Sequence, residues 1–136
     1  MSKEDLKVEV PDNFIITIME DNPKILQKWR DILGENNVNY FDHPDDFISD
    51  YRTNPMVSNT SLVICNYIFY NVLLPTALDF IYLENVLKYK GKFFIHSSSH
   101  NIIQNKHHYD FIFPSKDLFL NKEQLFFMTT NFESFI

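Results

Sequence analysis

The sequence has only one cysteine, Cys65, and only two glycines among its 136 residues. A single thiol excludes an internal disulfide framework and is typical of proteins from a reducing compartment. Two glycines leave few positions for the tight turns and phosphate-binding loops that glycine-rich motifs build. No apolar run approaches the roughly 20 residues of a membrane-spanning helix, and the charged start, MSKEDLKVEV, lacks the apolar core of a signal peptide. These absences predict a cytoplasmic protein without a membrane segment.

Basic residues are also fewer than acidic ones. Twelve Lys and Arg stand against 18 Asp and Glu, so the formal net charge is -6. This balance disfavours binding to nucleic acid or to an anionic membrane. Apolar residues make up 45% of the chain and include 14 Phe and seven Tyr, which suffices for the core of one domain. We therefore expect a polar lead-in over residues 1–12 and a single folded domain over residues 13–136.

Apolar runs alternate with helical patterns along the whole chain. Strands are predicted at 14–19, 38–41, 62–65, 92–96 and 109–113, and helices after Pro23, after Pro44, over 78–89 and near the C-terminus. The segment after the fourth strand is short, so its helix is expected to be one turn or irregular. Regular alternation of this kind predicts a doubly wound five-stranded parallel sheet with helices on both faces.

Polar residues follow four of the predicted strands, where the carboxyl ends of a parallel sheet form its functional edge. Glu20 and Asp21 end the first strand, in FIITIMEDNPKIL. Asn66 ends the third, in LVICNY, and Ser97 follows the fourth, in FFIHSSS. Lys116 comes after the fifth strand, in FIFPSKD.

This arrangement resembles the receiver domain of bacterial response regulators over nearly the whole chain, and the fold is then receiver-like, or flavodoxin-like. The resemblance implies that Glu20 and Asp21 hold Mg²⁺, that residue 66 accepts the phosphoryl group, and that Ser97 and Lys116 take part in the switch. Here the acceptor position is Asn66, and an amide is a poor nucleophile that cannot form an aspartyl phosphate. The chain is therefore expected to be a degenerate receiver, or pseudo-receiver, and not an enzyme.

Two interpretations of the acidic pair stay open. Glu20 and Asp21 are either the remnant of a weak Mg²⁺ site or solvated acids, with Asp21 or Asn22 capping the next helix. No cofactor is required in either case. Asn66 is expected to keep a structural hydrogen bond to Lys116 or Asp21, because a buried amide needs partners. An engineered change at this position is also compatible with the sequence.

The remaining side chains suggest no second site. The histidines at positions 43, 96, 100, 107 and 108 lack zinc-binding spacing and are expected at the surface or as helix caps. Cys65 is expected to be a buried, inert thiol. The aromatic C-terminal third cannot bury all of its rings on one helix face, so we expect a protein interface that includes Phe113, Phe119, Phe126 and Phe127.

Three functions follow from these features. The first is a stand-alone pseudo-receiver that binds proteins without phosphorylation, with a histidine kinase, a response regulator or a second copy of the chain as partner. The second is a phosphorylatable, Mg²⁺-dependent receiver that uses another acid, Asp79 or Asp110 being the nearest. The third is an unrelated ligand-binding or enzymatic α/β domain, since fold alone does not determine function.

Overall fold

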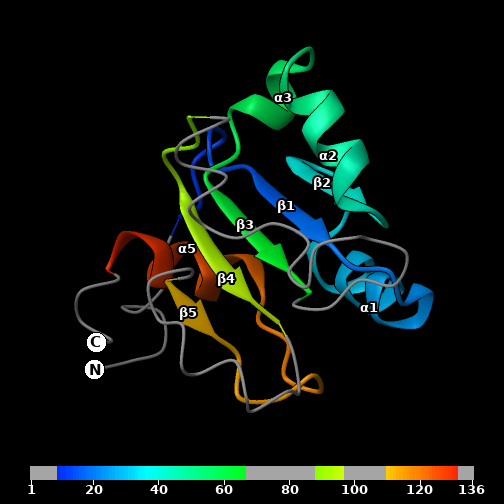
Figure 1. The fold of residues 1–136 in the computed structure, drawn as a ribbon. Coiled ribbons are helices and arrows are strands. Elements are labelled where there is room, and N and C mark those ends of the chain that lie inside the picture. The colour runs from blue at the N-terminus through cyan, green and yellow to red at the C-terminus, as the bar shows by residue number, and fades with distance from the viewer. Residues whose placement is uncertain (1–8, 67–87, 97–109, 132–136) are drawn as a thin grey trace.

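The structure is a computed structural model that describes residues 9–66, 88–96 and 110–131. Its strands form one five-stranded sheet in the order β2-β1-β3-β4-β5, and every neighbouring pair is parallel (Figure 1). The strands are β1 (Ile16–Met19), β2 (Val38–Phe41), β3 (Leu62–Cys65), β4 (Lys92–Ile95) and β5 (Phe111–Ile112). The helices in the described ranges are α1 (Pro23–Leu33), α2 (Pro44–Tyr51), α3 (Pro55–Ser58) and α5 (Lys122–Thr130). The predicted flavodoxin-like α/β fold is confirmed.

Helices cover both faces of the sheet. On one face, Phe47 of α2 and Val57 of α3 pack in a buried cluster with side chains of β1, β3 and β4. On the other, Trp29 of α1 and Leu125 of α5 pack in a second cluster that contains Ile16 and Ile18. Figure 1 shows α2 and α3 next to each other on one side of the sheet. The apolar residues on both faces of β1 and β3 explain why these strands are buried in the middle of the sheet.

Three helices begin at a polar cap that is followed by proline. Asn22, His43 and Asn54 each accept a hydrogen bond from a backbone N–H in the first turn of α1, α2 and α3. Proline suits the first helical position because it has no N–H to leave unsatisfied. The short helix α3 is missing from the prediction, although Asn54 and Pro55 repeat the signal that begins α1. Gly34 ends α1 with a φ of 76°, as expected for a glycine stop.

Several strand boundaries differ from the prediction. The run 14–19 was expected to be one strand, but β1 begins at Ile16 because the Phe14 N–H donates to the Pro11 carbonyl oxygen in a turn. The run 109–113 is reduced to the two residues of β5. Most of the helix predicted over 78–89, the short helix after β4 and the end of the last helix lie outside the described residues. None of the helices in the described ranges has the length and apolarity needed to cross a membrane.

Candidate functional site

The polar residues that follow β1, β3 and β4 lie side by side at the carboxyl edge of the sheet. Backbone hydrogen bonds continue the parallel ladder one residue beyond each strand. The Asn66 N–H donates to the Met19 carbonyl oxygen at 2.9 Å, and the His96 N–H donates to the Cys65 carbonyl oxygen at 3.0 Å. The ladder therefore holds Glu20, Asn66 and His96 at one level of the sheet.

Lys116 reaches this edge from the loop between β5 and α5. Its ammonium group donates to Glu20 Oε1, to Asn66 Oδ1 at 2.9 Å and to the His96 carbonyl oxygen at 2.9 Å. A lysine has three donor hydrogens, so these acceptors use all of them. The position of Lys116 after a proline left its reach open in the sequence, and the structure brings it into contact with Glu20.

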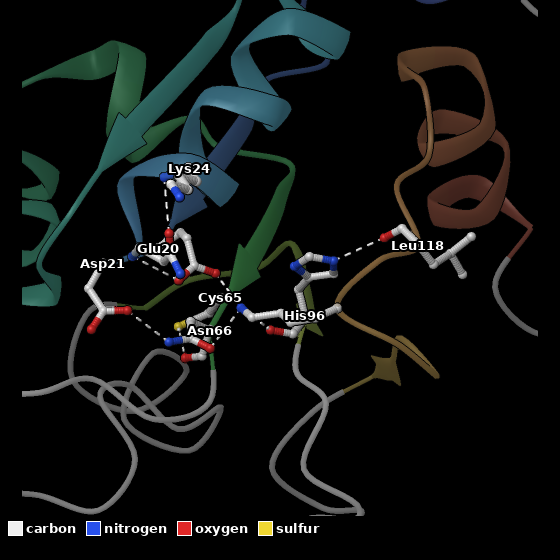
Figure 2. Close-up of polar contacts among 9 residues, drawn as sticks. Glu20, Asp21, Lys24, Cys65, Asn66, His96 and Leu118 are labelled. Carbon is white, nitrogen blue, oxygen red and sulfur yellow. Dashed lines mark hydrogen bonds and ion pairs between the residues drawn. The ribbon is translucent and has the colours of Figure 1, made fainter.

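Asn66 bridges a cation and an anion. Its Nδ2 donates to Asp21 Oδ1 at 3.0 Å, while its Oδ1 accepts from Lys116 (Figure 2). An aspartate at this position would have no hydrogen to donate to Asp21 at neutral pH, and two carboxylates would face each other. The expected structural hydrogen bond of Asn66 is confirmed, with both of the partners that the sequence suggested. We name Glu20, Asp21, Asn66 and Lys116 the strand-end cluster.

Glu20 is the most buried charged group of the strand-end cluster, with 2% of its surface exposed. Burial raises the pKa of its carboxyl group, and the hydrogen bond and charge of Lys116 act in the opposite direction. Its second oxygen, Oε2, accepts from the Asn22 N–H at 3.1 Å. Asn22 in turn caps α1 through its own side chain, which accepts from the Lys24 N–H at 3.0 Å. The helix cap that the sequence assigned to Asp21 or Asn22 is therefore Asn22.

This arrangement does not fit Mg²⁺. A magnesium ion requires oxygen ligands in near-octahedral geometry, but both oxygens of Glu20 and Oδ1 of Asn66 already accept hydrogen bonds. The Lys116 ammonium also contacts Glu20, one of the two acids that the resemblance assigns to the ion. Within the described ranges, no group of three or more His, Cys, Asp or Glu side chains is placed to hold a metal.

His96 is buried and not at the surface, so that part of the histidine prediction is wrong. Its ring is packed between Trp29, Phe113 and Phe119, with ring centroids 5.0 to 5.1 Å apart. Its Nε2 lies 2.9 Å from the Leu118 carbonyl oxygen and must donate to it, because a carbonyl only accepts. Burial lowers the pKa of His96 to about 4, and the nearby charge of Lys116 adds to this effect. The prediction of a capping role is confirmed for His43, which caps α2.

His96, the residue before Ser97, lies beside Asn66 in the sheet. The β3–β4 register pairs Cys65 with Ile95, and its continuation pairs Asn66 with His96. Ser97 lies outside the described residues, as do His100, His107 and His108. The sequence signal for His96 was its place as the last residue of the predicted strand 92–96.

The four phenylalanines predicted at an interface have different environments. Phe113 is 1% exposed and belongs to the core, so it offers no surface to a partner, contrary to expectation. Phe119 and Phe126 are partly buried against the same core cluster. Phe127 is 45% exposed on α5. Among these four, Phe127 has the most exposed side chain.

Two further predictions concern single side chains near the strand ends. Cys65 is buried as expected, and burial raises the pKa of its thiol well above the ordinary value. Asp110, an alternative phosphoacceptor, precedes β5, and its carboxylate accepts from the Phe93 N–H at 2.8 Å. It therefore lies at the amino end of the strands, away from Lys116. Asp79 lies outside the described residues.

Comparison with known proteins leaves the resemblance without outside support. No protein-family model matches the chain, and a search of curated proteins finds no match.

Proposed function

We propose that this protein is a pseudo-receiver that acts by binding other proteins and does not depend on aspartyl phosphorylation. The candidate partners are a histidine kinase, a response regulator or a second copy of the chain. The observation that carries the proposal is the state of Asn66, whose amide is held by Asp21 on one side and Lys116 on the other.

The chemistry of Asn66 supports a module without a phosphorylation switch. Its amide supplies no carboxylate nucleophile at the end of β3. The Lys116 ammonium contacts both this amide and Glu20 and donates to three acceptors in all. Lys116 supplies a counter-charge for Glu20, and the Asn66 amide donates a hydrogen bond to Asp21.

Surface properties favour a protein partner over nucleic acid. The net charge of -6 opposes attraction to a polyanion. The large apolar side chains Ile32, Leu118 and Phe127 are between 37% and 45% exposed. Aromatic and aliphatic side chains of this kind commonly anchor protein interfaces.

A ligand-binding or enzymatic domain is the second candidate, and one observation bears on it. A cavity of about 380 Å³ opens away from the strand-end cluster, lined by Thr60, Ser61, Lys90, Gly91, Lys92 and Thr129. The three hydroxyl groups in this lining each donate their hydrogen to a backbone carbonyl oxygen. None of them has a histidine or carboxylate base beside it in the lining, so the cavity lacks a nucleophile-base pair.

Incubation with a small phosphodonor and Mg²⁺ tests the proposal directly. We expect the intact mass of the wild-type chain to show no added phosphoryl group, because the residue at the end of β3 beside Lys116 is the amide Asn66 and not a carboxylate. The matched variant Asn66→Asp supplies that carboxylate and is expected to gain one phosphoryl group. A phosphoryl group on the wild-type chain, mapped to any aspartate, would overturn the proposal in favour of an active receiver.

Sedimentation over a wide concentration range tests the second copy as partner. If Phe127 anchors a homodimer, Phe127→Ser is expected to weaken the association at least tenfold, whereas Ile32→Ser on α1 serves as the matched exposed control. A wild-type chain that stays monomeric throughout would leave only a different protein as partner.

A further inference from the structure

An amine, an amide carbonyl and a buried carboxylate meet in the strand-end cluster, each from a different segment of the chain. Lys116 comes from the loop before α5, Asn66 follows β3 and Glu20 follows β1. We propose that Lys116 Nζ and Asn66 Cγ join in a spontaneous isopeptide bond, with Glu20 as the general base. The inference goes beyond the proposed function and rests only on this geometry.

The contacts place the reacting atoms together. Lys116 Nζ lies 2.9 Å from Asn66 Oδ1, so the amine stands beside the carbonyl that it would attack. The same nitrogen contacts Glu20 Oε1. On the far side of the amide, the leaving nitrogen Nδ2 donates to Asp21 Oδ1 at 3.0 Å. Figure 2 shows Glu20, Asp21 and Asn66 turned toward one another at the ends of their strands.

The reaction balances without an oxidant or a cofactor. Glu20 first takes one proton from the Lys116 ammonium, which leaves a neutral amine with a free electron pair. That pair forms the Nζ–Cγ bond, and the carbonyl electrons move onto Oδ1. A second proton passes from Nζ to Nδ2, the Cγ–Nδ2 bond breaks as the carbonyl re-forms, and ammonia leaves. The proton held by Glu20 then goes to the ammonia, so that one ammonium ion is released for each amide formed.

The surroundings favour each of these steps. Glu20 is 2% exposed, and its Oε1 contacts the Lys116 ammonium, so the proton passes directly between the two groups. The hydrogen bond from Asn66 to Asp21 fixes the amide plane and holds the leaving nitrogen. Groups oriented in this way reach effective concentrations on the order of 10⁵ to 10⁸ M, which compensates for the low reactivity of an amide.

The bond would make the strand-end cluster permanent. It would tie the end of β3 covalently to the loop that carries Leu118 and Phe119, and this loop is also held by the hydrogen bond from His96 to the Leu118 carbonyl oxygen. The position of that loop would then no longer respond to a ligand at the strand ends.

Intact-mass analysis of the full, folded chain provides the test. The purified protein is kept at neutral pH for several days, with folding checked by circular dichroism, and then digested for peptide mapping. We expect the chain to become lighter by one ammonia and to yield a branched peptide that joins Lys116 to residue 66. Lys116→Arg removes the nucleophile but keeps the charge, and is expected to retain full mass. Lys122→Arg, on the surface of α5, is the matched control and should react like the wild type.

Glu20→Gln tests the base. This variant keeps the size of the side chain but removes the proton acceptor, so bond formation is expected to slow on the order of 100-fold. A folded wild-type chain that keeps its full mass overturns the proposal. Loss of ammonia that persists in Lys116→Arg also overturns it, because the amide would then be closing on the backbone. Failure of the pseudo-receiver proposal would appear instead as a gain of mass with the phosphodonor.

Discussion

Acidification is expected to destabilise the folded protein through one buried side chain, His96. The imidazole is 1% exposed and packed among aromatic rings, and its Nδ1 has no hydrogen-bond partner in the described part of the chain. Burial, followed by the charge of Lys116, lowers the pKa of His96 to about 4 from an ordinary 6.5, while the Leu118 carbonyl oxygen and Asp117 act in the opposite direction. The folded state therefore resists protonation at a pH where the unfolded chain accepts a proton.

The sign and size of the effect follow from these two pKa values. Above pH 6.5 the imidazole is neutral in both states and stability does not depend on it. Below that value the unfolded chain binds a proton that the folded chain does not, so the free energy of unfolding falls. The loss reaches about 2 kcal/mol at pH 5 and levels off at about 3 kcal/mol below pH 4.

Urea denaturation at about pH 7.5 and about pH 5 measures this loss. Other groups also titrate in this range, so the relevant quantity is the difference between the wild type and His96→Phe. Phenylalanine fits an aromatic environment and has no proton to gain. That difference is expected to shift by about 2 kcal/mol between the two pH values, in favour of the variant at low pH. His43→Gln, at the exposed cap of α2, is the matched control.

A difference that stays constant between the two pH values would refute the reasoning. It would mean that His96 is protonated equally in both states, and therefore that the ring is not enclosed as described. An equal shift in the His43→Gln control would instead assign the effect to the surface.

Two further predictions concern a buried charge and a close backbone approach. Lys116→Met removes the counter-charge of Glu20 and is expected to lower the free energy of unfolding by about 3 to 5 kcal/mol at neutral pH. Urea denaturation measures this loss against wild-type protein whose full mass shows that it is not crosslinked. Without Lys116 the pKa of Glu20 rises further, so the folded variant takes up a proton on Glu20 when the solution is acidified. The difference in free energy of unfolding between the variant and the wild type should therefore shrink at lower pH, and a difference that grows would contradict this. Gly91→Ala would drive a methyl group into the Tyr89 hydroxyl and the Ser61 carbonyl oxygen, and thermal denaturation is expected to report a loss of about 1 to 3 kcal/mol. At Gly34 an added methyl group meets no atom, but the backbone φ is +76°. Gly34→Ala therefore serves as a control for backbone strain alone. An equal loss of stability in both variants would argue against the contact at Gly91.

The sequence predicted the fold class well because the relevant signals are local. Alternation of apolar runs with helical patterns needs only neighbouring residues. Two of the predicted strands coincide with β2 and β3, and a third covers all of β4 and one residue more. The ends of elements were predicted less well. Whether Phe14 joins β1 or a turn depends on a backbone hydrogen bond to Pro11, and the shortness of β5 depends on which residues pair with β4.

The sequence also placed the polar residues at the strand ends, since position after an apolar run is a one-dimensional property. It thereby determined that Glu20, Asp21 and Asn66 would share one edge of a parallel sheet. It could not determine their partners, because Lys116 is 96 residues from Glu20 and 50 from Asn66 along the chain. Only the path of the loop after β5 decides whether that ammonium reaches the acids.

The burial of His96 and Phe113 was decided by the tertiary structure alone. The sequence predicted His96 at the surface or as a helix cap. It predicted Phe113 at a protein interface. Both lie in the core because Trp29 and Phe119, from α1 and from the loop before α5, close over them. The sequence by itself thus determined an α/β sheet with acids and an amide at one edge. Tertiary packing decided that this edge is closed by a lysine and backed by a buried histidine, since both contacts join segments far apart in the chain.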